Sequence, residues 1–309
     1  MSDVRPDVSL LICTRDRSAS LAATLASVAR AVVAAPMLAI EVILVDNGSR
    51  DDTPRLLADW RPPCPVRRLS ETRPGLARAR NLGLAHARGR IVAMTDDDCV
   101  LHADYFVALT GAFAELAGPA IVGGRILLGD PADLPVTVKL EDHPMTALPG
   151  SFPGGFVMGA NLAFTADVPR RVGRFDERFG AGAPFVAAED TDFLFRAMRH
   201  EIALHYDHRF VVDHHHGRRH HAEETRLLAG YGFGDGALYA KHWRDPRIRR
   251  ALLRDIADLR RDLTDPVTTH AGIRAFYAFR LRHKLRGAVG YWRHRRAGAD
   301  RPSAAVDPS

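Results

Sequence analysis

IVAMTDDDC, residues 91–99, joins four apolar residues to three consecutive aspartates. A short apolar run of this kind is typical of a buried strand, which we expect to span residues 91–95. Asp96, Asp97 and Asp98 would then follow the carboxyl end of that strand. Adjacent ionised carboxylates repel one another unless they are separated or a cation neutralises them. The cluster therefore needs a physical explanation.

Similar apolar runs recur on both sides of this stretch. They predict strands at residues 8–13, 40–45 and 66–69, and helical patterns lie between them at residues 18–33, 53–60, 75–87 and 103–116. Alternating helices and continuously apolar strands are typical of a parallel sheet that is covered on both faces. Ligands of such sheets bind at the carboxyl ends of the strands, which is where Thr14, Arg15, Asp46 and the aspartates lie.

The pattern changes after residue 118. We expect strands at residues 120–128, 159–164, 202–206 and 210–213, a helical turn at 168–172 and a helix at 189–199, with residues 130–153 as an irregular loop. From about Gly217 the chain is predicted to be helical and basic. The predicted fold class is α/β, with a Rossmann-like, mostly parallel central sheet flanked by helices and a helical, basic C-terminal extension.

Charge and cysteine usage limit the class of protein. Residues 241–301 contain 17 Lys and Arg against 6 Asp and Glu, whereas residues 1–240 contain 26 against 30. The pI of 9.6 thus reflects the C-terminal segment and does not indicate a nucleic-acid-binding core. The three cysteines are far apart and form no C-x-x-C pair, which fits a reducing cytosol. We see neither a signal peptide nor a membrane-spanning run and expect a cytoplasmic protein.

A hard divalent cation would explain the aspartate cluster. Mg²⁺ and Mn²⁺ prefer oxygen ligands, commonly one or two carboxylates together with substrate phosphates. A metal held by these aspartates would bridge a diphosphate and stabilise it as a leaving group. The alternative is a solvated helix N-terminus, where the helix dipole favours aspartate.

Two carboxylates, Glu189 and Asp190, open a predicted helix after a glycine-rich loop. A helix start on a loop is suited to presenting a general base to an acceptor hydroxyl. The alternative is that one of these carboxylates is only the N-cap of the helix.

Histidines crowd the segment that follows the last predicted strand. His214 and His216 would lie on the same side of an extended chain, and imidazole suits Zn²⁺ or Mn²⁺. A separate zinc site and a solvated loop without ligands both remain open here. Farther on, residues 274–296 combine helically spaced apolar residues with many arginines, a pattern that fits either contact with an anionic membrane or packing on the catalytic domain.

Five elements, in this order, resemble the inverting nucleotide-sugar glycosyltransferases of family 2, which have the GT-A fold. The elements are VSLLICTRDR (8–17), EVILVDNGSRDDT (41–53), RPGLARARNLGLAHARG (73–89), TDDDC (95–99), and FDERFG (175–180) followed by AAEDTDFLFRAMR (187–199). The resemblance implies a GT-A catalytic domain at residues 1–217, with a nucleotide half at about 1–118 and an acceptor half at about 119–217. We expect a helical basic region at 218–296 and a disordered tail at 297–309.

The resemblance also implies roles for residues of the donor site. Thr14, Arg15 and Asp46 would lie around the base and ribose, and Arg80 and Asn81 would face the nucleotide or brace the site.

The metal and the reacting groups are implied in the same way. Asp98 would contact Mn²⁺ or Mg²⁺, with Asp96 nearer the ribose and as a further metal ligand, and with Asp97 able to substitute. His214 would approach the metal or the diphosphate. Asp190 would be the general base, with Glu189 beside it.

The activity implied is an inverting transfer from a UDP-, GDP- or dTDP-sugar to a hydroxyl of a glycan or glycolipid, as in polysaccharide biosynthesis. The C-terminal helix would make peripheral contact with anionic lipid at the inner face of the plasma membrane, and we do not expect nucleic acid as a partner. One alternative is a sugar nucleotidyltransferase, although CTRDRSAS (13–20) lacks the expected glycine- and arginine-rich loop. Others are a basic membrane- or nucleic-acid-binding protein that acts through its C-terminal segment, and an inactive relative.

Overall fold

The computed structural model describes residues 5–298, which form two compact units. The first unit contains the chain up to Ala183 together with Glu189–His220, and the second contains Pro184–Ala188 together with the chain from His221 onward.

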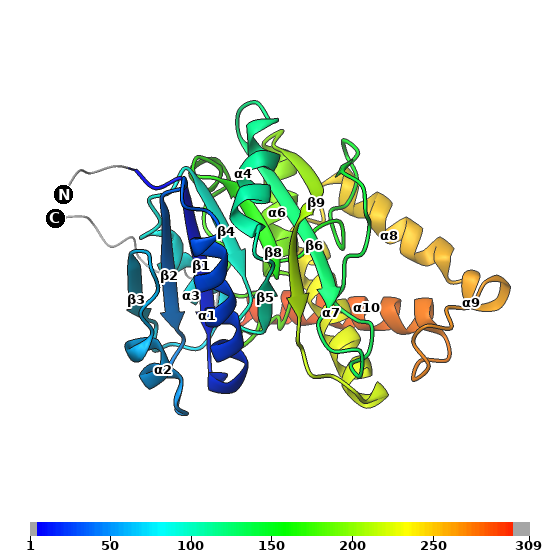
Figure 1. Ribbon diagram of the computed structural model, residues 1–309. Coiled ribbons are helices and arrows are strands. Elements are labelled where there is room, and N and C mark those ends of the chain that lie inside the picture. Colours follow the sequence, from blue (N-terminus) through cyan, green and yellow to red (C-terminus); the bar gives the residue numbers. More distant parts are fainter. Residues whose placement is uncertain (1–4, 299–309) are drawn as a thin grey trace. The chain divides into compact units, whose positions relative to one another are not determined.

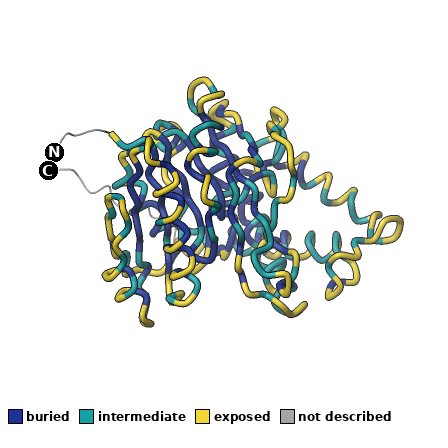
Figure 2. Tube along the Cα trace, viewed as in Figure 1, coloured by how far each residue is buried: buried dark blue, intermediate teal, exposed yellow. Residues whose placement is uncertain are grey.

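The first unit begins with a parallel sheet in the order β3-β2-β1-β4 (Figure 1). Its strands and the helices that connect them are β1 (Val8–Thr14), α1 (Ser18–Val33), β2 (Ile40–Asp46), α2 (Thr53–Asp59), β3 (Val66–Ser70), α3 (Leu76–Leu84) and β4 (Ile91–Thr95). Continuous apolar sequence makes β1, β2 and β4 almost wholly buried (Figure 2). The expected parallel arrangement is confirmed for this half.

The sheet becomes mixed in its second half. The additional elements are β5 (Cys99–Leu101), α4 (Tyr105–Ala114), β6 (Ala120–Leu128), β7 (Met145–Thr146), β8 (Asn161–Thr165), α5 (Val168–Val172), α6 (Glu189–Arg199) and β9 (Ala203–His214). Strand β8 lies antiparallel between β4 and β6, whereas β9 runs parallel to β6. An apolar strand has the same sequence pattern in either direction, so the expectation of a mostly parallel sheet describes only the first half.

Three strand predictions differ from the structure. The strands expected at residues 202–206 and 210–213 are one strand, β9, which begins at Ala203. Its pairing with β6 shifts register between Gly124 and Arg125 of β6. Strand β5 was not predicted, because only three residues separate the aspartates from the next turn. Strand β7 interrupts the segment that was expected to be an irregular loop.

Alternation along the strands creates a core on each face of the sheet. Leu10 and Ile12 face the helix side that includes Leu25 of α1, and Leu11 faces the side that includes Ala77 of α3. Because every strand of the parallel half is anchored on both faces, its carboxyl end is held in a defined position for the polar residues that follow it.

The second unit is helical, as expected from Gly217 onward. Its helices are α7 (His221–Lys241), α8 (Pro246–Asp258), α9 (Arg261–Thr264) and α10 (Phe276–Arg296). Helices α7 and α10 approach each other closely at glycines. A Cβ atom on Gly236 would collide with the carbonyl of Lys284, and a Cβ atom on Gly287 would collide with the carbonyl of Phe233. Lys284 is buried there and forms an ion pair with Asp255 at 2.7 Å.

None of the helices in residues 5–298 combines the length and the apolar character needed to cross a membrane. Most of the tail expected to be disordered, residues 299–309, lies outside the described residues.

Candidate active site

The carboxyl ends of three neighbouring strands bring the first predicted residues together. Thr14 pairs with Asp46 in register, and Ile12 pairs with Thr95, the residue before Asp96. Thr14 is only 3% exposed, and its Oγ1 has no hydrogen-bond partner within the described part of the chain. A buried hydroxyl without a partner at this edge is available to a bound ligand.

Two arginines compensate the three aspartates: Arg80 lies beside Asp96, and Arg17 lies beside both Asp97 and Asp98. Asp96 Oδ1 lies 3.3 Å from Arg80 Nη2, Asp97 Oδ1 lies 3.5 Å from Arg17 Nε, and Asp98 Oδ2 lies 2.6 Å from Arg17 Nη2. The repulsion within the cluster is therefore partly compensated by the protein itself. Burial still raises the pKa of Asp97 to about 6.

The pairing of β5 with β9 places His214 beside Asp98. Cys99 is in register with His214, and the amide of His215 donates to the carbonyl of Asp98 at 2.8 Å. His214 Nε2 consequently lies 3.2 Å from Asp98 Oδ1. Although burial alone would act in the opposite direction, His214 and Arg17 lower the pKa of Asp98, and Asp98 raises the pKa of His214.

This pair fits a divalent cation. Asp98 Oδ1 is buried, and no hydrogen bond to it meets ordinary geometry among the described residues. Ligand atoms of Asp98, Cys99 and His214 lie within 4.8 Å of one another. Burial raises the pKa of the Cys99 thiol, which favours a protonated sulfur, whereas carboxylate and imidazole are good ligands for Mn²⁺. Asp98 and His214 are thus the better donor set.

Arg80 links the aspartate cluster to the second pair of carboxylates. It is 4% exposed, and its Nη1 lies 2.9 Å from Glu189 Oε1 while its Nη2 contacts Asp96. Burial, together with the neighbouring Asp190, raises the pKa of Glu189 to about 7. Arg80 is therefore a structural counter-ion for two carboxylates from different elements.

Asp190 is held by backbone amides at the start of α6. Its Oδ2 accepts a hydrogen bond from Gly159 N at 2.9 Å, and its Oδ1 accepts one from Thr191 N at 2.7 Å. These two hydrogen bonds fix the orientation of the carboxylate. The side chain is neither buried nor fully exposed, so each oxygen can still accept a proton or a hydrogen bond from outside.

The remaining predicted donor residues have different surroundings. Asp46 Oδ1 accepts from Ser49 N at 2.9 Å and shapes the turn after β2. Arg15 is exposed, with Asp16 at 3.7 Å. The amide of Asn81 exchanges two hydrogen bonds with the backbone of Phe175, at 2.9 and 2.8 Å, an arrangement that corresponds to the bracing role.

Sequence reasoning missed Arg17 and the importance of the Gly159 amide. Arg17 ends the stretch VSLLICTRDR (8–17), but only the tertiary structure shows that its guanidinium contacts Asp98. Gly159 accommodates Arg80 closely, because a Cβ atom there would lie 2.9 Å from Arg80 Nη2.

The histidine-rich segment does not converge on a second metal site in the described chain. His216 Nε2 lies 3.1 Å from Leu134 O and its Nδ1 accepts from Arg218 N at 3.0 Å, so both ring nitrogens are used. His221 belongs to the other unit, where it pairs with Glu224 at 3.1 Å.

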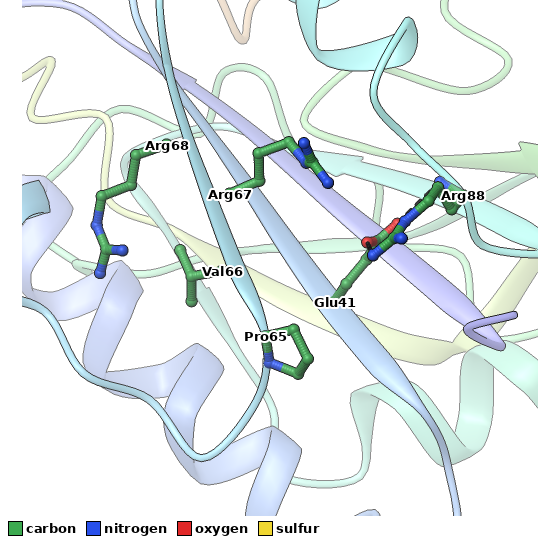
Figure 3. Close-up of a pocket in the computed structure, with 6 residues that line it drawn as sticks. All are labelled: Glu41, Pro65, Val66, Arg67, Arg68 and Arg88. Carbon is green, nitrogen blue, oxygen red and sulfur yellow. Dashed lines mark hydrogen bonds and ion pairs between the residues drawn. The ribbon is translucent and has the colours of Figure 1, made fainter. Parts of the chain in front are cut away.

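A separate pocket opens near the amino ends of β2 and β3 (Figure 3). It is lined by Glu41, Pro65, Val66, Arg67, Arg68 and Arg88. Glu41 is buried and accepts from Ser9 Oγ and from Arg88 N, which makes it a structural brace. The pocket lies at the opposite ends of the strands from Thr14, Asp46 and Asp96.

The sheet topology and the polar carboxyl edge define a Rossmann-like α/β protein with a candidate ligand site at the carboxyl ends of its strands. Residues 9–144 match the family model described as Glycosyl transferase family 2. The chain carries a family 2 glycosyltransferase domain with the GT-A fold, and the protein is a glycosyltransferase.

Solved structures agree on the fold. A mannosyltransferase from Pyrobaculum calidifontis, PcManGT in complex with GDP-Man and Mn²⁺, is 20% identical with a TM-score of 0.62, over 92% of this chain and 88% of that one. S. aureus TarS 1–349 is 13% identical with a TM-score of 0.52, over 94% and 92%. The same TarS fragment with UDP-GlcNAc is 14% identical with a TM-score of 0.51, over 94% and 92%. No curated protein sequence matches the chain.

Proposed function

We propose that this glycosyltransferase is metal-dependent and inverting, and that it moves a sugar from a UDP-, GDP- or dTDP-sugar to a hydroxyl of a glycan or glycolipid. The observation that carries the proposal is the facing pair Asp98 Oδ1 and His214 Nε2, 3.2 Å apart. A carboxylate oxygen without a hydrogen bond, facing an imidazole nitrogen, is suited to a divalent cation. Bound donors in related folds, GDP-Man with Mn²⁺ and UDP-GlcNAc, support the same donor class.

Asp98 and His214 would hold Mn²⁺ or Mg²⁺, with Asp96 as the further carboxylate of the donor site. A cation there would neutralise charge on a diphosphate leaving group. The chain would bind the rest of the donor with Thr14, Arg15 and Asp46 at the ends of β1 and β2.

Asp190 is proposed to accept the proton of the acceptor hydroxyl. The amides of Gly159 and Thr191 hold its carboxylate in a fixed orientation, and a carboxylate oxygen can accept a proton from a hydroxyl. A base that is fixed beside the donor site lets the hydroxyl attack the anomeric carbon from the side opposite the leaving group, which inverts the configuration. Glu189 is less suited to this role, because Glu189 is buried and its Oε1 is paired with Arg80.

A thermal-shift panel tests the donor site. UDP, GDP, dTDP and CDP would each be added with Mn²⁺, Mg²⁺ or EDTA, since a ligand of the folded state raises the melting temperature by mass action. We expect one nucleotide to raise it with metal but not with EDTA, and the shift to vanish in Asp98→Asn. The absence of a shift for every nucleotide would remove the metal-bridged donor from the proposal.

The acceptor is proposed to be reached at an anionic membrane, at the inner face of the plasma membrane. Helix α10 buries Lys284, Gly287 and Tyr291, while Leu285, Val289 and Trp292 are 54%, 50% and 42% exposed. Arginines flank this apolar row at positions 282, 286, 293 and 296, and residues 276–296 contain no Asp or Glu. Apolar side chains between cationic ones suit the interface of an anionic bilayer.

Vesicle flotation tests this contact. We expect the protein to float with phosphatidylcholine/phosphatidylglycerol vesicles but not with phosphatidylcholine alone, and the joint replacement of Leu285, Val289 and Trp292 by serine to abolish flotation. Leu263→Ser on α9, where the side chain is 89% exposed, is the matched control. Failure of the wild type to float, or flotation of the triple variant, would discard the membrane contact without affecting the donor site.

A further inference from the structure

Thr137 has a backbone conformation that is unusual for its residue type. It lies between β6 and β7 with φ of 55°. The other non-glycine residues with positive φ in the described chain are Asp16, Ala188 and Glu201, none of which is β-branched. A β-branched residue in this region is strained, and such strain persists where neighbouring contacts enforce it, often at functional sites.

Contacts on both sides hold Thr137 in this conformation. Two residues after it, Lys139 and Ile126 exchange backbone hydrogen bonds of 2.9 and 3.0 Å. Before it, Leu134 N donates to Arg218 O at 2.8 Å. The segment is thus attached both to β6 and to the residues that follow β9.

A further pair of contacts secures the same segment. The carboxylate of Asp133 accepts from Gly217 N at 2.8 Å and from Arg219 Nε at 3.1 Å. The chain around Thr137 is therefore fastened alongside the residues that directly follow His214.

The conformation of Thr137 turns two oxygen atoms toward His214. Its carbonyl and its Oγ1 lie 3.3 and 3.2 Å from His214 Nδ1. The hydroxyl donates its own hydrogen to Val136 O at 2.6 Å, so it can only accept from the ring. Two acceptors at Nδ1 require that this nitrogen carries the hydrogen, which leaves the Nε2 lone pair of the neutral ring facing Asp98 Oδ1.

We propose that Thr137 is a positioning residue that fixes the tautomer and ring orientation of His214, so that Nε2 is presented as a ligand to a divalent cation. Metal-binding histidines commonly depend on such a hydrogen bond at the other ring nitrogen. The proposal rests on the proposed function, because the cation belongs to the donor site. The segment 133–137 thereby supports that site through the contacts of Thr137 with His214.

Two variants separate this role from packing. Thr137→Val keeps the shape and loses the hydroxyl acceptor, whereas Thr137→Ser keeps the acceptor. Binding of Mn²⁺ alone to the full chain would be measured by electron paramagnetic resonance of the free ion. We expect Thr137→Val to weaken binding about 10-fold or more and Thr137→Ser to stay within about 2-fold of wild type, with Asp98→Asn as the control for site occupancy.

A second measurement needs no metal. The tautomer of His214 would be read from ¹⁵N-edited NMR spectra of the metal-free protein at alkaline pH, with the His214 signals assigned from a His214→Gln spectrum. We expect the Nδ1-protonated form in wild type and Thr137→Ser. In Thr137→Val we expect a mixture of the two neutral tautomers. Equal Mn²⁺ affinity and an equal tautomer in Thr137→Val would overturn the role of the Thr137 hydroxyl while leaving the cation site intact. If wild type bound no Mn²⁺, the cation role of both His214 and Thr137 would fall, whatever the tautomer.

Discussion

Arg80→Met removes a buried cation that contacts both Glu189 and Asp96, at 2.9 and 3.3 Å. Methionine is unbranched like arginine but carries no charge, so the two carboxylates lose their shared counter-ion. Breaking a buried pair by deleting one partner typically costs about 3–5 kcal/mol. For a chain of this size that corresponds to a fall of roughly 6–20 °C in melting temperature.

The loss is expected to depend on pH. Burial already raises the pKa of Glu189 to about 7, and without Arg80 that pKa rises further, because Arg80 is one of the influences that lower it. A group whose folded-state pKa is raised above its unfolded value destabilises the fold as pH increases, until the pH passes the folded pKa. Wild type and variant share this loss up to about pH 7. Above it only the variant continues to lose stability.

Differential scanning fluorimetry at pH 6.0 and 8.5 measures the effect, and the deficit of Arg80→Met should be clearly larger at pH 8.5. The control is Arg55→Met, since Arg55 is 82% exposed and lies 3.8 Å from Asp59. Surface pairs of this kind contribute about 0.5 kcal/mol or less. A deficit that is equal at both pH values, or no larger than that of Arg55→Met, would refute the counter-ion role.

Three further outcomes are expected. Gly287→Ala should destabilise the protein by roughly 1–3 kcal/mol, because the new Cβ would meet the carbonyl of Phe233. Gly111→Ala in α4 places its Cβ in open space and should stabilise the protein by up to about 1 kcal/mol. Urea denaturation measures both changes in the free energy of unfolding, and changes of the same sign would contradict the close helix contact. Asp190→Asn should lower kcat at least about 100-fold while leaving the nucleotide-induced thermal shift unchanged, and near-normal turnover would exclude it as the base. Burial raises the pKa of Cys64 to about 11. Its alkylation by iodoacetamide at pH 7, followed by mass spectrometry, should therefore be about two orders of magnitude slower than that of a free thiol. Labelling at the rate of a free thiol would show that the sulfur is not shielded.

Much of the fold follows from local pattern. The apolar runs of β1, β2 and β4 and the helices between them were predicted within a few residues, because burial on both faces of a parallel sheet imposes a continuous apolar sequence. The same reasoning placed Thr14, Asp46 and Asp96 at one edge. Strand β5 and the direction of β8 were not predicted, since three residues carry no periodicity and an apolar strand does not record its direction.

The sequence by itself determined which residue types stand at the carboxyl ends of the strands and which helix begins with Glu189 and Asp190. Only the tertiary structure decided how these charges are paired. Arg17 reaches Asp98 across 81 positions, and the register of Cys99 with His214 depends on β5 lying beside β9. Ion pairs and ring orientations of this kind depend on contacts between distant segments, and no local preference encodes them.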